Sequence, residues 1–162
     1  MKVEQLMTRE VKVCRADDSV NRAAQLMWEY DCGFIPVISS NGDGAVVGVV
    51  TDRDIAMATY TQGKAPIAIP ITVAMSHEVI ACHTADGISQ AEALMRDHHV
   101  RRVPVLDQKE RLVGVLSLND IAREVQREAA GTRRAEVTAE ALADTLAEIC
   151  RPRGTYQVTV AA

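Results

Sequence analysis

The chain has 162 residues, which suggests one domain or two very small ones, and its 48% hydrophobic and 25% charged residues are the balance of a globular protein. Aromatic residues make up only 3%, so the core must be built from Ala, Val, Ile, Leu and Met, and stacking on RNA bases or single strands is disfavoured. The net charge of −4 argues against a nucleic-acid partner.

The sequence contains no recognisable targeting or membrane segment. Residues 1–5 lack the apolar run of a signal peptide, and the most apolar stretch, residues 65–75, contains two prolines and is far too short to cross a bilayer. The four cysteines show no C-x-x-C spacing. We therefore expect a cytoplasmic protein in a reducing compartment, with no membrane partner.

An internal repeat divides the chain. The Met-Thr pair at 7–8 recurs 68 residues later as Met-Ser at 75–76. The spacing falls to 66 after the loop at 39–44, which is two residues longer than its counterpart. Two units this small should pack on each other to form a core. The expected organisation is repeat 1 at 1–62, a linker at 63–70, repeat 2 at 71–126 and a tail at 127–162.

The first unit reads as strand, helix, two strands and helix. A β-branched stretch at 11–14 precedes a helix for which Ser19 is the expected N-cap. Two apolar strands at 34–38 and 45–50 follow, joined by a turn with Asn-Gly and Asp-Gly pairs, and the second helix should begin near Asp54. The apolar stripe expected on the first helix is Val20, Ala23, Ala24, Met27 and Tyr30.

The second unit repeats this order with strands at 79–82, 103–106 and 112–116 and a last helix from near Asp120. Its first helix has a potential capping box in Ser89 and Glu92, although the start could also lie nearer Asp86 or Ile88. Proline cannot donate to a ladder, so Pro36 and Pro104 are expected at strand starts or edges. The fold class is α/β (α+β), with the order β-α-β-β-α twice.

The tail contains one amphipathic segment. Gly131 should end the preceding helix, and Thr138 could cap a new helix that runs to Cys150. Its acidic polar face favours packing on the module, across a dimer or on a protein partner over membrane binding. Residues 155–160 alternate like a short strand. The expected apolar face is Val137, Ala141, Leu142, Leu146 and Ile149.

Each unit ends its second hairpin strand with the same pattern, a glycine followed by two apolar residues, a hydroxyl residue, two variable residues and an aspartate. The hydroxyl of Thr51 or Ser117 can cap the next helix or meet a phosphate at the helix N-terminus, while the carboxylate of Asp54 or Asp120 suits the paired hydroxyls of a ribose. For a single copy, a plain helix cap is the more common explanation. The repetition with an upstream glycine favours a defined module.

Together, these motifs resemble a pair of cystathionine-β-synthase-type (CBS) domains, also called a Bateman module, of the kind found in standalone bacterial proteins. The resemblance covers about residues 1–126 and depends on the Met-Thr/Ser openings, the segments at 34–38 and 102–107 and the two glycine-to-aspartate patterns. It implies two units packed with pseudo-twofold symmetry, a disc-like homodimer, and a non-catalytic sensor that binds AMP, ADP or ATP, or else S-adenosylmethionine. No cofactor is required.

The resemblance assigns residues to two ligand clefts. In the first, Asp54 would hold the ribose, Thr51 the ribose or phosphate, and Arg53 and Arg102 the phosphate, while Val79 and Ala81 cover the base. In the second, Asp120 and Ser117 take the polar roles, and Thr8, Val11 and Val13 lie against the base. Because Leu118-Asn119 and Gly33-Phe34 replace charged counterparts, the first cleft is expected to be the stronger for phosphorylated ligands.

Other residues of the sequence allow alternative interpretations. The pair His98-His99 beside Arg101 and Arg102 could suggest a metal, but no Cys or carboxylate stands at ligand spacing, and a solvated basic turn is favoured. Cys14 and Cys82 fit buried small hydrophobes better than a redox pair. An enzyme is disfavoured because the tail is too short for a catalytic domain. The remaining alternative is a structural or partner-docking dimer with empty clefts, and Trp28 is expected on a helix surface or dimer contact.

Overall fold

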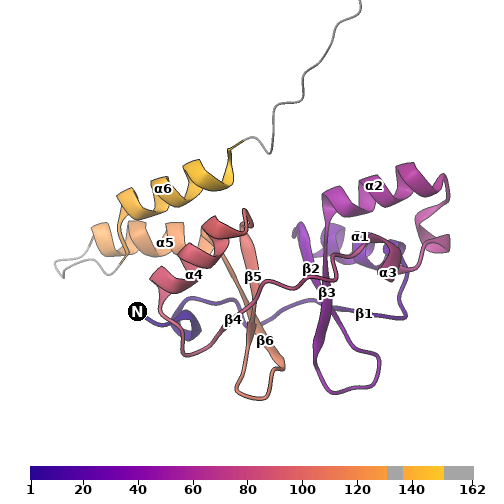
Figure 1. Cartoon of the computed structure of the whole chain (residues 1–162), viewed down its shortest axis with the longest axis horizontal. Coiled ribbons are helices and arrows are strands. Elements are labelled where there is room, and N and C mark those ends of the chain that lie inside the picture. The colour runs from indigo at the N-terminus through magenta and orange to yellow at the C-terminus, as the bar shows by residue number, and fades with distance from the viewer. Residues whose placement is uncertain (131–136, 152–162) are drawn as a thin grey trace, which may run out of the picture.

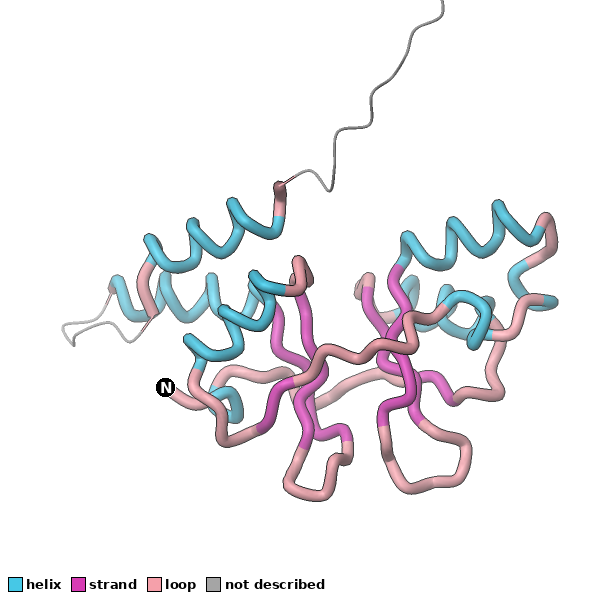
Figure 2. The backbone as a smooth tube through the Cα atoms, in the orientation of Figure 1, coloured by secondary structure: helices cyan, strands magenta, loops and turns pink. Residues whose placement is uncertain are grey.

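The computed structural model describes residues 1–130 and 137–151, and within them the chain forms two similar units (Figure 1). Each unit has a three-stranded sheet in which the first strand runs parallel to the second and the second antiparallel to the third. The two hairpins lie side by side at one end of the molecule, and the helices gather at the other end (Figure 2). The predicted α/β repeat with a C-terminal helix is confirmed.

The elements of each unit follow the predicted order. Each unit opens with a short helical segment, and this segment packs on the other unit, as described below. In unit 1 the elements are η1 (Val3–Gln5), β1 (Cys14–Arg15), α1 (Val20–Glu29), β2 (Phe34–Ile38), β3 (Val46–Thr51) and α2 (Asp52–Gln62). In unit 2 they are η2 (Pro66–Ala68), α3 (Ile71–Ala74), β4 (Cys82–His83), α4 (Ile88–Asp97), β5 (Arg102–Leu106), β6 (Leu112–Ser117) and α5 (Leu118–Ala129).

Three local predictions are corrected. The first strands are only two residues long, beginning at Cys14 and Cys82, and the segments before them run without regular structure. Helix α4 begins after Gly87, whose backbone N–H donates to Gln90 Oε1, so Ser89 is not its N-cap. Tyr30 lies beyond the end of α1 and is half exposed, so it does not belong to the buried stripe.

Pro36 lies within the central strand of its sheet, not at a strand start or edge. It stands opposite Val49. The backbone N–H and C=O of Val49 both bond to Ser76, so Val49 needs no backbone hydrogen bond from Pro36. On the other side β1 begins its pairing only at Val37. Proline has no backbone N–H to donate, and none is needed here because the short β1 does not extend alongside Pro36. Pro104 occupies the equivalent place in β5.

The two units exchange their opening segments. Thr8 exchanges two backbone hydrogen bonds with Val115 of β6, and Ser76 exchanges two with Val49 of β3. The buried side chains follow the backbone: Val3 and Met7 belong to the core of unit 2, and Ile71 and Met75 to that of unit 1. Each core is thus completed by the segment that opens the other repeat, which joins the units tightly.

The two glycines of the repeat pattern, Gly48 and Gly114, stand at these crossings. A Cβ on Gly48 would lie 2.6 Å from Met75 Sδ and 2.8 Å from the carbonyl oxygen of Ser76. A Cβ on Gly114 would lie 2.7 Å from Met7 Sδ. Of the two roles considered for these glycines, the approach of another backbone is therefore the one that the structure shows.

Helix α6 (Ala139–Ile149) packs on α4 and α5, so the tail covers unit 2 of its own module. The Thr138 hydroxyl accepts a hydrogen bond from the Ala141 N–H, as predicted for the N-cap. The buried face is formed by Val137, Leu142, Thr145 and Ile149, whereas Ala141 and Leu146 are exposed. The predicted end of the previous helix at Gly131 and the predicted strand at 155–160 lie outside the described residues.

Candidate functional site

The hydroxyl and aspartate of the repeated pattern form a capping box at the start of α2. Thr51 Oγ1 accepts from the Asp54 N–H at 3.3 Å, and Asp54 Oδ2 accepts from the Thr51 N–H at 2.8 Å and from its hydroxyl at 2.7 Å. The helix-cap role considered for this pattern is therefore real. It uses one carboxylate oxygen, and within the described chain no hydrogen bond engages Asp54 Oδ1, which leaves an acceptor for a ligand.

The same capping box recurs at the start of α5, but the residues around its aspartate differ. Asp120 Oδ2 accepts from the Ser117 N–H at 2.8 Å and from the Ser117 hydroxyl. Asp120 is only 7% exposed, and its second oxygen is held by Arg123. The position that corresponds to Arg123 in α2 is Met57. The two aspartates therefore share a local structure but differ in charge balance, because only Asp120 has its own guanidinium.

The exchanged segments bring the expected apolar walls to the expected places. Since Ser76 pairs with β3, the chain that follows it toward Val79 and Ala81 runs beside the unit that carries Thr51. Since Thr8 pairs with β6, the chain toward Val11 and Val13 runs beside the unit that carries Ser117. These four apolar residues are half-buried, and they remain predicted base contacts.

Arg102 begins the hairpin that Ser117 ends. The register of β5 and β6 sets Arg102 directly opposite Ser117, so it belongs to the same end of the same sheet as Asp120. The residue opposite Thr51 is Phe34. The contact of Arg102 with a ligand held by Thr51 and Asp54 stays a prediction.

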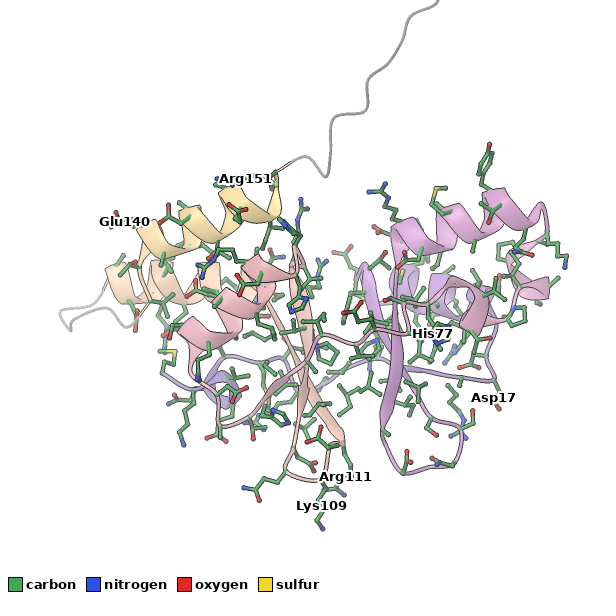
Figure 3. The ribbon with its side chains drawn as sticks, in the orientation of Figure 1. Asp17, His77, Lys109, Arg111, Glu140 and Arg151 are labelled. Carbon is green, nitrogen blue, oxygen red and sulfur yellow. The ribbon has the colours of Figure 1, made fainter. Side chains whose placement is uncertain are left out.

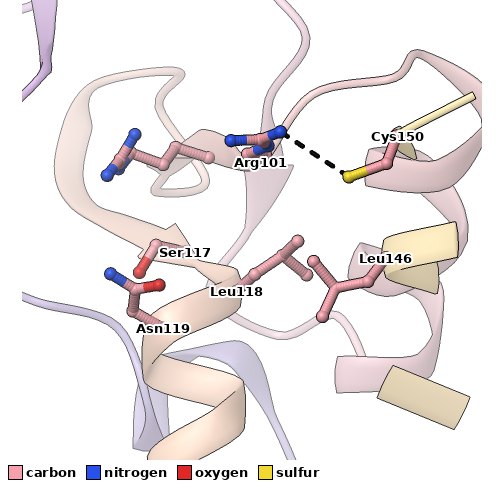
Figure 4. A pocket seen from close by; sticks show the side chains of 7 residues that line it. Arg101, Ser117, Leu118, Asn119, Leu146 and Cys150 are labelled. Carbon is pink, nitrogen blue, oxygen red and sulfur yellow. Dashed lines mark hydrogen bonds between the residues drawn. The ribbon is translucent and has the colours of Figure 1, made fainter. Parts of the chain in front are cut away.

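A cavity of about 330 Å³ opens at this end of unit 2 (Figure 4). Among described residues, Arg102 has no hydrogen-bond or ion-pair partner, and Arg101 donates only to the thiol of Cys150, at 3.6 Å. The cavity therefore joins two guanidinium groups to the N-terminal turn of α5, a combination that suits an anion. Its lining is Arg101, Arg102, Ser117, Leu118, Asn119, Leu146 and Cys150.

The matching end of unit 1 lacks the arginine pair and carries Asp52 and Arg53 in place of Leu118 and Asn119. Gly33 and Phe34 replace the two arginines, and the Asp52 carboxylate lies over Gly33, with Oδ2 3.2 Å from the point where a Cβ would stand. Arg53 is exposed and makes no side-chain hydrogen bond within the described residues. The expectation that this cleft is the stronger for phosphates stays a prediction, and the register sets Arg102 beside Ser117.

Two residues of the cavity, Leu146 and Cys150, were not assigned to a site from the sequence. Both come from α6, and a tail that folds back onto the cleft leaves no local pattern in the repeats. Arg101 and Asn119 were noted in the sequence, but neither was chosen as a site residue. The hairpin itself holds a detectable signal for Arg101, since it stands next to Arg102 and hence near Ser117.

The other candidate features carry no separate site. Within residues 1–130 and 137–151, no three His, Cys, Asp or Glu residues gather as metal ligands. Burial raises the pKa of the Cys14 thiol to about 11 and that of Cys82 to about 12, which fits their prediction as inert core residues.

The charged hairpin tip with Lys109 and Arg111 lies at the opposite end from α6 (Figure 3). Among the described helices, none is long and apolar enough to cross a membrane.

Comparison with known proteins identifies the family. The CBS domain model matches residues 3–60 and 70–127, and the chain belongs to the CBS domain family as a CBS pair. It is 34% identical over 131 residues to the CBS domain-containing protein YhcV of Bacillus subtilis, covering 80% of this chain and 90% of that protein. CBS pairs are regulatory modules. The match covers only 23% of the homoserine O-acetyltransferase of Methanococcoides burtonii and 21% of the inosine-5'-monophosphate dehydrogenase of Streptococcus pyogenes.

Solved structures show the same fold. Hypoxic Response Protein I with two coordinated zinc ions is 30% identical, with a TM-score of 0.68, over 76% of this chain and 98% of that one. The CBS pair of MJ0100 in complex with 5-methylthioadenosine and S-adenosyl-L-methionine is 23% identical, with a TM-score of 0.70, over 79% and 98%. CBSX2 in complex with AMP is 24% identical, with a TM-score of 0.68, over the same shares.

Proposed function

We propose that this protein is a non-catalytic sensor that binds an adenosyl ligand in the clefts of its CBS pair and passes the signal to a protein partner or through its own dimer. Two structural neighbours were solved with such ligands, AMP in one and methylthioadenosine with S-adenosylmethionine in the other. In this chain we assign the ribose hydroxyls to the carboxylates at the starts of α2 and α5, Asp54 with one oxygen that makes no hydrogen bond within the described chain and Asp120 with its second oxygen paired to Arg123.

The observation that carries the proposal is the pair of arginines beside Ser117. Arg101 and Arg102 face the cavity at the start of α5 and have no carboxylate partner within the described residues. Charge-assisted bonds from guanidinium groups to phosphate oxygens are the strong kind. We therefore assign AMP, ADP or ATP to the cleft of unit 2. The cleft of unit 1, with Asp52 over Gly33, suits an uncharged or cationic adenosyl group such as S-adenosylmethionine.

The direct test is calorimetric titration of the full chain with AMP, ADP, ATP and S-adenosylmethionine. The proposal expects a phosphorylated ligand to bind and expects Arg102→Gln to weaken it while leaving S-adenosylmethionine unchanged. Heat from none of the four ligands would contradict the sensor function and favour the structural alternative. Equal weakening of both ligand classes by Arg102→Gln would contradict the division between clefts.

The structural alternative has its own support in an uncovered apolar surface on unit 1. Trp28 is 90% exposed and Tyr60 is 80% exposed, on the helices that correspond to those α6 covers in unit 2. Exposed apolar groups of this size mark interaction sites. We assign this face to the predicted homodimer. Light scattering should give a dimer for the native chain and a monomer for the Trp28→Ser, Tyr60→Ser variant, whereas a native monomer would contradict it.

A further inference from the structure

The last turn of α6 forms part of the cavity that contains the two arginines. Leu146 and Cys150 line it together with Arg101 and Leu118 (Figure 4). Leu146 is 39% exposed although it stands on a helix that otherwise buries its apolar face, and its side chain is directed toward Leu118. The wall that these residues make has no counterpart among the described elements of unit 1.

Arg101 is held at this wall by a contact that an anion can replace. Its guanidinium donates to Cys150 Sγ at 3.6 Å, and a thiol sulfur is a weak acceptor. A phosphate oxygen is a far stronger partner for the same N–H group. The contact therefore keeps Arg101 at the mouth of the cavity without neutralising it.

The docking of α6 on α4 is incomplete in its polar contacts. Glu92 Oε1 on α4 and Thr145 Oγ1 on α6 are both buried and have no hydrogen-bond partner among the described residues. Buried groups of this kind oppose the packing that Val137 and Ile149 favour. Just beyond the end of α4, His99 Nδ1 lies 3.2 Å from the Glu148 carbonyl oxygen of α6. An element with such opposed contributions belongs to the part of a fold that opens most easily.

We propose that α6 is a ligand-responsive wall of the Arg101–Arg102 pocket, so that a phosphorylated ligand in this cleft and the docking of α6 stabilise each other. A ligand that reaches Arg101 and also packs against Leu146 contacts both parts of the pocket, and it binds the docked state more tightly than the undocked one. By linkage, the ligand holds α6 in place as strongly as α6 holds the ligand. This inference depends on the proposed function, and it makes α6 the element whose docking changes when a ligand occupies the pocket.

The experiment uses amide hydrogen exchange with AMP as the probe. Residues 139–143 of α6 lie about one to two turns before Leu146 and are too far from the cavity for direct contact with the ligand, so slower exchange there reports docking. Saturating AMP should slow it by about fivefold or more, the lower end of typical couplings. In a Cys32→Ser background, the exposed Cys150 thiol should also react more slowly with a disulfide reagent when AMP is bound.

A matched pair of variants tests the same coupling from the other side. Leu146→Ser removes the apolar wall and should weaken AMP binding about fivefold or more, with only a small fall in the unfolding midpoint because the side chain is 39% exposed. Ala143→Ser, on an exposed part of the same helix, should leave AMP binding unchanged. AMP binding with unaltered α6 exchange and unaltered Leu146→Ser affinity would overturn this inference alone. Absence of AMP binding would overturn it together with the phosphate assignment.

Discussion

The sulfur of Met75 lies 2.6 Å from the point where a Cβ on Gly48 would stand. This contact joins the opening of the second repeat to the closing pattern of the first, and Met7 makes the same contact with Gly114. Two features that look independent in the sequence, the Met-Thr/Ser opening and the glycine of the later motif, are therefore the two sides of one crossing between the units.

Replacing Gly48 with alanine should destabilise the fold. The new methyl would meet the Ser76 carbonyl oxygen at 2.8 Å, and this backbone is fixed by two hydrogen bonds to Val49 and cannot move away freely. Overpacking of this kind costs about 1–3 kcal/mol. Urea unfolding should show a larger loss for Gly48→Ala than for Gly87→Ala, where the nearest atom is a side-chain oxygen at 3.5 Å and only an N-cap preference for glycine is lost. Equal stability of the two variants would argue against the crossing.

Removing the cap aspartate should shorten or loosen α2. Asp54→Ala deletes the acceptor of two hydrogen bonds from Thr51, and loss of a helix cap costs about 0.5–2 kcal/mol. Asp52 is exposed and lies two residues before Asp54, so Asp52→Ala should cost less unfolding free energy in the same denaturant titration. A larger loss for Asp52→Ala than for Asp54→Ala would contradict the capping geometry.

Glu92 should make the protein less stable as the pH rises. Burial raises the pKa of this carboxyl, and Arg96 lowers it only in part. Its contribution to stability is therefore complete below the pKa of the unfolded chain and is lost as pH rises through the higher folded value. Relative to Glu92→Gln, the native chain should lose unfolding free energy as the pH rises above about 4.3, the ordinary pKa of a glutamate. The exposed Glu140→Gln variant serves as control, and a parallel pH profile for native and Glu92→Gln protein would contradict the burial.

The four thiols should differ in reactivity in the order of their exposure. Cys150 is exposed and Cys32 half-buried, whereas Cys14 and Cys82 are buried with pKa values raised to about 11 and about 12. Thiolates are the reactive form, so brief alkylation near pH 7.5, read by mass spectrometry, should label Cys150 first and the two core thiols only after unfolding. Labelling of Cys14 in the folded protein at the rate of Cys150 would refute this order.

Much of the fold could be predicted because its signals are local. The hairpins, the capping residues Thr51, Ser117 and Thr138, and the order of elements all follow from turn chemistry and periodicity, and the structure confirms them. The exchange of opening segments could not be predicted in this way. It depends on long-range pairs such as Thr8 with Val115, for which neither residue carries a distinctive local signal.

The candidate site was predicted in its residue types, but one neighbour relationship within it could not be predicted. Arg102 was grouped with Thr51 and Asp54 because it matches a family position that contacts phosphate, whereas the register within the hairpin sets it opposite Ser117. The face of α6 was wrong in part for a physical reason: Thr145 is buried and Leu146 is exposed, because Leu146 faces the cavity and not the core. Hydrophobicity alone does not separate these two environments.

The central claim is that the arginine pair of unit 2 binds the phosphate of an adenosyl ligand. Calorimetric titration of AMP into the native chain, Arg102→Gln and Arg53→Gln tests it most directly, since both substitutions remove one guanidinium and only the first removes it from the cavity. We predict that Arg102→Gln weakens AMP binding by about tenfold or more, the effect of losing one charged hydrogen bond, and that Arg53→Gln changes it less than about twofold. Absence of AMP binding to the native chain, or a loss at Arg53 as large as that at Arg102, would contradict the account.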